Sequence, residues 1–271
     1  MEKVKRNERI AVMTRVLTEN PNKLFTLTHF SKLFSAAKST ISEDFVIIRN
    51  AFEDFHLGEI ETITGASGGV KYHPSSNRER DIAFIESICA ELNDPQRTLP
   101  GGFLYMSDIL SNPAKVQYMG EMLAKRFTPA SPDFVLTIET RGIPVALMTA
   151  RVLGLPLVIA RRDNRMLEGS LVTINYLSGS GRMETMSLAR RAVKEGQRAL
   201  VIDDFMRAGG SAKGLSDMMR EFNVNIAGIG MVMAMTMPAR KLVEDYTALM
   251  VASDTGEGTL RVQPAGWLQK E

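Results

Sequence analysis

Two adjacent carboxylates and a cluster of small residues follow one apolar segment of the chain. The segment Ala199–Asp203 is apolar up to its last residue, Asp204 comes next, and Gly209, Gly210 and Ser211 follow shortly after. Backbone N–H groups of small residues at a helix start bind anions such as phosphate, and the helix dipole favours the negative charge. Paired carboxylates suit the vicinal hydroxyls of a ribose, or a divalent metal. We therefore expect a ribose 5-phosphate site.

This segment, LVIDDFMRAGGSAKG, resembles the phosphoribosyl pyrophosphate (PRPP) motif of the type I phosphoribosyltransferases. In that family a second loop binds pyrophosphate, and the matching position here is ETRG, where Arg141 would supply charge and Gly142 close backbone approach. The stretch Arg161–Arg191 matches a mobile hairpin that closes over PRPP in the family. The resemblance implies that PRPP is contacted by Asp203, Asp204, Phe205, Met206, Arg207, Ala208, Gly209, Gly210, Ser211, Thr140, Arg141, Gly142, Tyr105 and Arg161.

Alternating strands and helices are expected to position these loops. The expected strands are Phe134–Glu139, Leu157–Ala160, Val172–Tyr176, Ala199–Asp203 and Ile226–Ala234, and the expected helices are Pro144–Gly154, Met183–Glu195 and Ser211–Phe222. Continuous apolar strands between helices indicate a parallel sheet covered on both faces. Ligands bind such sheets at the carboxyl ends of the strands. We predict an α/β chain whose residues 75–271 form a type I phosphoribosyltransferase-like, parallel-sheet effector domain that binds PRPP.

A smaller domain is expected over residues 1–74. A polar connector with Pro74, Tyr72–Asp81, marks the boundary. Alternation from Ile60 to Tyr72 around a glycine-rich tip predicts a β-hairpin. Thr40 and Glu43 form a capping-box pattern that marks a helix start. Apolar stripes at helical spacing predict helices over Lys5–Asn20, Thr26–Phe34 and Thr40–Phe55. Three helices and a hairpin together predict a winged helix-turn-helix domain, which binds DNA.

The charge distribution supports a DNA contact in this domain. Residues 1–50 hold nine Lys and Arg against five Asp and Glu, whereas residues 51–74 hold one against four. A positive surface that neutralises phosphates is expected of a DNA-binding protein. The start of the third helix would face a major groove. The expected DNA contacts are Lys5, Arg6, Arg9, Lys38, Ser39, Thr40, Ser42 and Lys71. A helical protein-interaction domain is the alternative.

Composition excludes several classes of protein. Cys89 is the only cysteine among 271 residues, so the chain forms no intrachain disulfide, and a reducing cytoplasmic compartment is expected. The N-terminal segment has no apolar core of a signal peptide, and no run of about 18 apolar residues predicts a membrane span. Cys89 lies in an apolar run and is expected to be a buried small residue and not a nucleophile.

Two features favour a sensor over an enzyme. Type I enzymes commonly have Ala-Thr-Gly-Gly-Thr in the PRPP loop, whereas this chain has Arg207, Ala208 and then Gly-Gly-Ser, which removes one hydroxyl and adds a bulky cation. A DNA-binding domain also precedes the α/β domain. Over nearly its whole length, including KSTISEDFVIIRNAF, GASGGVKYHP and GGFLYMSDIL, the chain resembles the purine operon repressors of Gram-positive bacteria.

That resemblance implies a homodimeric transcriptional repressor that binds operator DNA of purine biosynthesis genes and is released by PRPP. It further implies no transferase activity, and competition from guanosine tetraphosphate for the PRPP pocket. No cofactor is expected to be required, no catalytic residue and no protein-held metal are assigned, and it stays open whether Mg²⁺ accompanies PRPP. Two alternatives are an active purine phosphoribosyltransferase with an accessory N-terminal domain, and a repressor whose α/β domain only dimerises.

Overall fold

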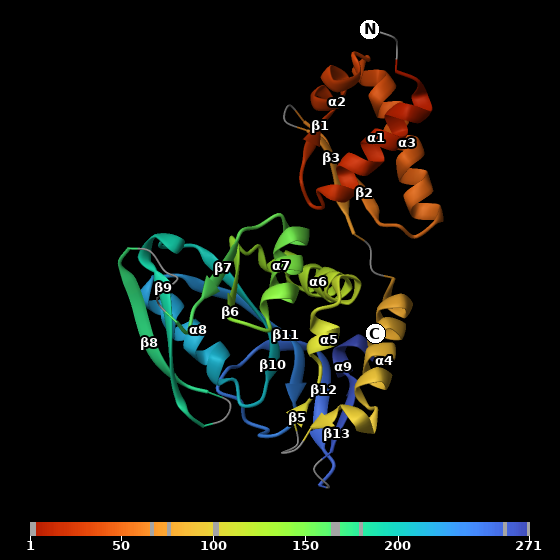
Figure 1. Ribbon diagram of the computed structural model, residues 1–271. Helices are drawn as coiled ribbons and strands as arrows, with labels where there is room; N and C mark the ends of the chain where they lie inside the picture. Colours follow the sequence, from red (N-terminus) through yellow and green to blue (C-terminus); the bar gives the residue numbers. More distant parts are fainter. Residues whose placement is uncertain are drawn as a thin grey trace. The chain divides into compact units, whose positions relative to one another are not determined.

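The computed structural model describes residues 4–65, 68–74, 77–99, 103–163, 169–178, 181–256 and 259–269. The tip of the N-terminal hairpin at Ala66–Ser67 and parts of the stretch Arg161–Arg191 therefore lie outside the described residues. The chain divides into two compact units, one formed by Met1–Asn77 with Arg151–Gly154 and one by Arg78–Ala150 with Leu155–Glu271 (Figure 1). Each unit has its own elements and core.

The N-terminal unit contains three helices, α1 (Arg6–Glu19), α2 (Leu27–Phe34) and α3 (Lys38–Asp54). Thr26 precedes α2 and its hydroxyl accepts a hydrogen bond from the backbone of His29, so that one free amide of the first turn is satisfied. The helix α3 begins at Lys38 with no side-chain cap, so the predicted capping box at Thr40 is wrong. The backbone N–H of Ile41 donates to the carbonyl oxygen of Ala37, so the first helical turn already forms before Thr40.

A small antiparallel sheet completes this unit. Its strands are β1 (Phe25–Thr26), β2 (Glu59–Ile63) and β3 (Gly69–His73), in the order β1-β3-β2. Apolar residues from all three helices and from the hairpin form one core, which includes Met13, Phe30, Ile41 and Val70. The helices and the hairpin are therefore held together by apolar burial, and the topology is that of a winged helix.

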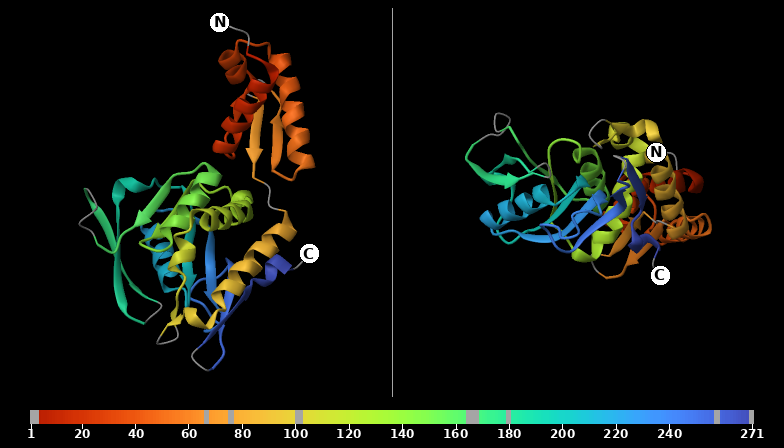
Figure 2. Two further views of the ribbon diagram at one scale, coloured as in Figure 1. Left: turned by 45° about the vertical axis from the view of Figure 1, so that its right-hand side comes forward. Right: turned by 90° about the horizontal axis from the view of Figure 1, so that it is seen from below.

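The C-terminal unit is built on a six-stranded sheet in the order β13-β12-β11-β10-β6-β7 (Figures 1 and 2). Neighbouring strands are parallel except that β13 is antiparallel to β12. The α/β fold with a largely parallel sheet is thus confirmed. The strands are β6 (Phe134–Ile138), β7 (Leu157–Ala160), β10 (Arg198–Met206), β11 (Asn225–Met235), β12 (Tyr246–Asp254) and β13 (Leu260–Pro264).

Alternate residues of β11 face different helices, so helices cover both faces of the sheet. Ile229 and Met231 lie in a core cluster with Leu215 and Met218 of α8 (Gly210–Glu221), whereas Gly228 and Gly230 lie against the ring of Phe127 at the end of α6 (Pro113–Phe127). The remaining longer helices are α4 (Arg78–Leu92), which packs on β13, and α7 (Ile143–Leu153), which follows β6.

A two-stranded hairpin lies beside α8, where the sequence predicted a helix in place of its second strand (Figure 2). Its strands are β8 (Leu171–Leu177) and β9 (Met183–Ala189), so the helix predicted over Met183–Glu195 is wrong. Met, Glu, Leu and Ala are good helix formers, but the buried Met186 and Leu188 alternate along β9, and pairing with β8 overrides the local preference.

The remaining elements are short. They are β4 (Thr98–Leu99), β5 (Phe103–Leu104), α5 (Ser107–Leu110), α9 (Gly266–Gln269) and 3₁₀ turns at Pro95–Arg97, Thr128–Ala130 and Arg190–Ala192. Within the described ranges no helix is long and apolar enough to span a membrane. Cys89 is buried in α4, and burial raises the pKa of its thiol to about 12, which agrees with a packing residue.

Candidate effector-binding and DNA-binding sites

The two predicted carboxylates lie near the end of β10 and are both buried. Asp203 and Asp204 are 7% and 6% exposed, and the backbone N–H of Asp204 donates to Oδ1 of Asp203 over 2.9 Å. Burial, followed by the neighbouring charge of Asp204, raises the pKa of Asp203 well above the usual carboxyl range. A pair of buried acids that lack a full set of donors is suited to binding hydroxyl groups of a ligand.

The small residues after β10 open the helix α8. Gly209 is the N-terminal cap residue and has φ of +89°, a left-handed conformation that glycine adopts without strain. Gly210 begins the helix, so the amides of the first turn have no partner within the helix. Together with the helix dipole, these amides have the geometry that can bind an anion.

The second predicted loop meets the first one. The guanidinium of Arg141 lies 3.0 Å from Oδ2 of Asp204, and a methyl group added at Gly142 would overlap Oδ1 of Asp203. The Arg141 contact is an ion pair without a well-aligned hydrogen bond, so Oδ2 of Asp204 can still accept from a ligand. The buried hydroxyl of Thr137 also has no hydrogen-bond partner among the described residues. The ends of β6 and β10 therefore present unsatisfied polar atoms at one place.

Glu139 anchors the segment that follows β7. Its carboxylate accepts from the guanidinium of Arg161 over 3.1 Å and from the backbone N–H groups of Arg162 and Asp163. Burial alone would raise the pKa of Glu139, but these hydrogen bonds lower it overall. Arg161, a predicted PRPP contact, thus has an intramolecular partner, while Thr140 follows Glu139 in the loop before α7.

Two predicted effector contacts lie in a strand and not in the loop that follows it. The strand β10 continues to Met206, so Phe205 and Met206 belong to the strand and not to the phosphate loop. The Met206 side chain is buried in the core, so a ligand could contact this residue only through its backbone. Tyr105 is 45% exposed just after β5, with its ring against the guanidinium of Arg97.

Lys241, which the sequence did not single out, contacts the loop after β10. Its ammonium donates to the carbonyl oxygens of Arg207 and Met235 over 2.6 and 2.7 Å, and the backbone N–H of Leu242 donates to Ala208 over 2.8 Å. Burial lowers the pKa of Lys241. These contacts connect the loop after β10, which resembles the PRPP motif, to the segment between β11 and β12. No motif surrounds this lysine, so only the tertiary structure identifies it.

The predicted DNA face is largely exposed at the start of α3. Lys38, Ser39 and Ser42 are exposed, Thr40 is half-buried, and Lys71 is half-buried on β3. A groove of about 500 Å³ runs between α3 and the hairpin, lined by Lys38, Ser42, Arg49, Thr62, Thr64 and Gly68 among others. Arg49, not predicted as a site residue, donates to the carbonyl oxygen of Ile60 over 3.1 Å and to the hydroxyl of Thr62.

One arginine of α1 does not match its predicted role. Arg9 is 6% exposed, and its guanidinium donates to Oδ2 of the buried Asp44 over 2.7 Å. Its charge is therefore neutralised inside the domain, and the predicted DNA contact of Arg9 is corrected. Arg6 also pairs with Asp44, over 3.1 Å, but stays half-exposed, and Lys5 is exposed at the start of α1.

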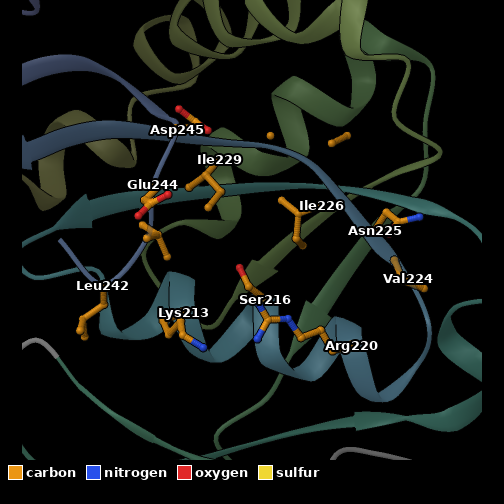
Figure 3. Close-up of a pocket in the computed structure, with 13 residues that line it drawn as sticks. Lys213, Ser216, Arg220, Val224, Asn225, Ile226, Ile229, Leu242, Glu244 and Asp245 are labelled. Atoms are coloured by element: carbon orange, nitrogen blue, oxygen red, sulfur yellow. The ribbon is translucent and has the colours of Figure 1, made fainter.

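A further hollow, of about 650 Å³, lies between α8 and the start of β11 (Figure 3). It is lined by Lys213, Ser216 and Arg220 of α8, by the start of β11 with Asn225, Ile226 and Ile229, and by Leu242–Asp245. Its lining does not include the predicted PRPP contacts. Among the described residues, no three His, Cys, Asp or Glu side chains are grouped to hold a metal ion.

Comparison with known proteins places these features in a family. Residues 5–74 match the model of the bacterial purine repressor N-terminal domain, and residues 106–270 match that of the phosphoribosyl transferase domain. The chain is 40% identical over 270 residues to the purine biosynthesis transcriptional repressor PurR of Bacillus subtilis (strain 168), covering 98% of this chain and 95% of that protein.

Two further similarities bear on the sign of regulation and on the fold. The purine biosynthesis transcriptional activator PurR of Lactococcus lactis subsp. lactis is 38% identical over 248 residues, covering 91% of this chain and 92% of that one. The adenine phosphoribosyltransferase of Thermoanaerobacter pseudethanolicus superposes with a TM-score of 0.54 at 22% identity, over 63% of this chain and 99% of that one. The second similarity is one of fold.

Proposed function

Because this chain belongs to the family of bacterial purine repressors, we propose that it is a transcriptional regulator of purine biosynthesis genes that binds operator DNA and senses PRPP. The winged-helix unit would hold the DNA, and the phosphoribosyltransferase-like unit would bind PRPP as the effector. The observation that carries the PRPP assignment is the meeting of two loops: buried Asp203 and Asp204, the glycine loop before α8, and Arg141 lie together.

Each part of PRPP has a chemically matched group in this arrangement. The ribose diol would donate to Asp203 and Asp204, the 5-phosphate would accept from the amides of Gly209–Ser211, and the pyrophosphate would lie at the loop of Thr140–Gly142 near Arg141. Arginine binds phosphate oxygens through charge-assisted hydrogen bonds. Mg²⁺ in proteins is commonly held by one or two carboxylates together with substrate phosphates, so these acids suit an ion that arrives with PRPP.

PRPP and DNA are proposed to oppose each other. If PRPP favours one arrangement of a homodimer and operator DNA another, each ligand lowers the affinity for the other by the same factor. The coupling free energy is typically about 1–3 kcal/mol. We propose repression that PRPP relieves, following the relative that matches over 98% of the chain. Because another relative is named an activator, a reporter fusion with and without the regulator gene determines the sign. A cytoplasmic location, homodimerisation and competition by guanosine tetraphosphate belong to the same proposal.

The test is a DNA-binding titration on purine-gene promoter fragments at fixed salt, with and without PRPP. The wild-type protein should release DNA as PRPP rises. A variant carrying Asp203→Ala and Asp204→Ala should bind DNA as the wild type does and ignore PRPP. Loss of DNA binding by that variant in a salt-matched assay, with its fold intact, would contradict the division of roles. DNA retention by the wild type that does not respond to PRPP would favour a domain that only dimerises.

A second candidate function is purine phosphoribosyl transfer, because the C-terminal unit has the phosphoribosyltransferase fold. We propose that the chain is not an enzyme, on the grounds of Arg207 and Ala208 in the phosphate loop. Incubation with Mg²⁺, PRPP and each purine base, with pyrophosphate as the readout, decides between them. Steady release of pyrophosphate would establish the enzyme.

A further inference from the structure

Lys241 joins the carboxyl ends of two neighbouring strands. Met206 of β10 pairs with Ala234 of β11, so these parallel strands end side by side. The ammonium of Lys241, in the segment after β11, donates to the carbonyl oxygen of Met235 over 2.7 Å and to that of Arg207 over 2.6 Å. The first carbonyl belongs to the end of β11, and the second to the loop after β10. The lysine therefore holds the start of the proposed phosphate loop.

The two residues that follow Lys241 support the same loop. The backbone N–H of Leu242 donates to the carbonyl oxygen of Ala208 over 2.8 Å. A methyl group added at Gly209 would lie 3.3 Å from Cγ2 of Val243 and 3.5 Å from the backbone nitrogen of Leu242. Figure 3 shows Leu242 beside the start of α8. Three consecutive residues that begin at Lys241 thus lie against three consecutive residues of the loop.

These contacts fix the direction of two peptide N–H groups. The peptide bonds before Ala208 and before Gly209 are both trans, and in a trans peptide the C=O and the N–H point in opposite directions. Because the two carbonyls are directed at Lys241 and Leu242, the N–H groups of Ala208 and Gly209 point away from that segment. Neither N–H has a hydrogen-bond acceptor among the described residues. Both can therefore donate to an anion on the opposite side of the loop.

The charge of Lys241 is balanced only by dipoles. Its side chain is half-buried, and burial lowers the pKa of the ammonium. Its acceptors are the two carbonyl oxygens, and within the described ranges no carboxylate forms an ion pair with it. A cation that is partly removed from water is stabilised by an opposite charge nearby. A phosphate group bound at the loop would supply that charge.

We infer that Lys241 is a positioning residue of the 5-phosphate site, which directs the N–H of Ala208 at the phosphate by holding the carbonyl of Arg207. The inference rests on the proposed function, because it takes the loop before α8 as the 5-phosphate site. It adds the amide of Ala208 to those of Gly209–Ser211 as a phosphate donor. Lys241 acts through this peptide unit and through its positive charge, without touching the ligand.

Removal of the ammonium should weaken phosphate binding. Lys241→Met keeps an unbranched side chain but removes the charge and the donor, so the full chain with this change should bind ribose 5-phosphate about tenfold more weakly, as expected for one hydrogen bond to a charged group. Lys194→Met removes an exposed lysine of the same unit and is the matched control, which should bind as the wild type does. Calorimetric titration at fixed salt measures the affinities, and circular dichroism checks that each variant is folded.

A second measurement detects the direction of the amide itself. The chain contains three Arg-Ala peptide bonds, whose amides belong to Ala192, Ala199 and Ala208. With ¹³C in the arginine carbonyls and ¹⁵N in the alanines, a carbonyl-filtered NMR spectrum shows these three amides alone. Saturating ribose 5-phosphate should move the Ala208 amide proton of the wild type downfield, because a phosphate that accepts from an amide deshields its proton, and should leave the other two in place. In Lys241→Met the shift at saturation should be smaller.

The shift at saturation distinguishes positioning from stability. A residue with only a structural role would weaken binding without changing the Ala208 shift of the saturated complex. An unchanged affinity of Lys241→Met, an equal loss in Lys194→Met, or a full Ala208 shift in Lys241→Met would overturn the inference. A wild-type complex whose Ala208 amide does not move would also overturn it, and this result requires no variant to fold. Absence of ribose 5-phosphate and PRPP binding by the wild type would overturn the proposed function as well.

Discussion

The guanidinium of Arg141 lies 3.0 Å from Oδ2 of Asp204 and connects the loop after β6 to the end of β10. Asp204 is buried whereas the Arg141 side chain is half-exposed, so the arginine neutralises a carboxylate that water hardly reaches. In the proposed complex the ribose diol would take over at Asp204, and the arginine would become available to the pyrophosphate.

Gly142→Ala should disturb the contact between the loop after β6 and the end of β10, and so weaken PRPP binding. The added methyl group would overlap Oδ1 of Asp203, and such overpacking typically costs about 1–3 kcal/mol, here expected as a ten- to hundredfold loss of PRPP affinity. Gly266→Ala is the matched control, because nothing lies within 4 Å of its added methyl group. Calorimetric titration with PRPP measures both. Equal affinity of the two variants would place PRPP away from this loop.

Asp203→Asn should stabilise the free protein at neutral pH. Burial and the charge of Asp204 raise the pKa of Asp203, so the folded state holds its proton to a higher pH than the unfolded chain, whose carboxyl titrates near 3.8. Stability of the wild type is therefore lost as pH rises from about 4 through the raised pKa, and the asparagine variant avoids this loss. The difference in melting temperature should grow from pH 4 to pH 8.

The exposed Asp245 provides the comparison for that series. Asp245→Asn should give only a small difference from the wild type, because its side chain is exposed. If the advantage of Asp203→Asn were constant over the same range, an effect other than the raised pKa of Asp203 would be responsible.

Asp44→Ala should destabilise the winged-helix unit without removing any proposed DNA contact. The change leaves the buried guanidinium of Arg9 without its carboxylate partner, which typically costs about 3–5 kcal/mol. Urea unfolding followed by circular dichroism measures the loss. Glu19→Ala, which breaks the exposed pair with Arg15, should change stability by less than about 1 kcal/mol. The double variant Arg9→Met with Asp44→Leu should recover part of the free energy of unfolding that Asp44→Ala loses. If it recovers none, the unpaired charge of Arg9 is not the cause of the loss.

Lys38→Ala should weaken DNA binding and flatten its dependence on salt. Lys38 is exposed at the start of α3 and lines the groove toward the hairpin, so it is placed to neutralise a phosphate, and its loss should lower the slope of log K against log salt by about 1. PRPP affinity should not change. Lys194→Ala, an exposed lysine of the other unit, is the control, and an identical effect of both substitutions would move the DNA face away from α3.

Local patterns predicted most of the elements of both units. Apolar stripes at helical spacing gave α1, α2 and α3 to within a few residues, and the apolar segment before Asp203 predicted β10. The glycine-rich loop with its two acids was recognisable because its chemistry depends on residues adjacent in the chain. By contrast, the sequence pattern did not predict α4, α6, β12 or β13, which have no distinctive chemical motif.

Contacts between residues distant in the chain were decided only by the tertiary structure. Met183–Ala189 has the composition of a helix but is a strand, because β8 offers it a partner and a buried face. Arg9 resembles a phosphate-binding residue but is buried, because Asp44 lies 35 positions later on α3.

The sequence by itself thus determined which residues could bind a ribose phosphate and DNA, since those types and spacings are local. The tertiary structure decided which of them are free to do so. The pairing of Arg141 with Asp204 and of Lys241 with the Arg207 carbonyl depends on how strands and helices pack, and packing is a property of the whole core and not of any segment.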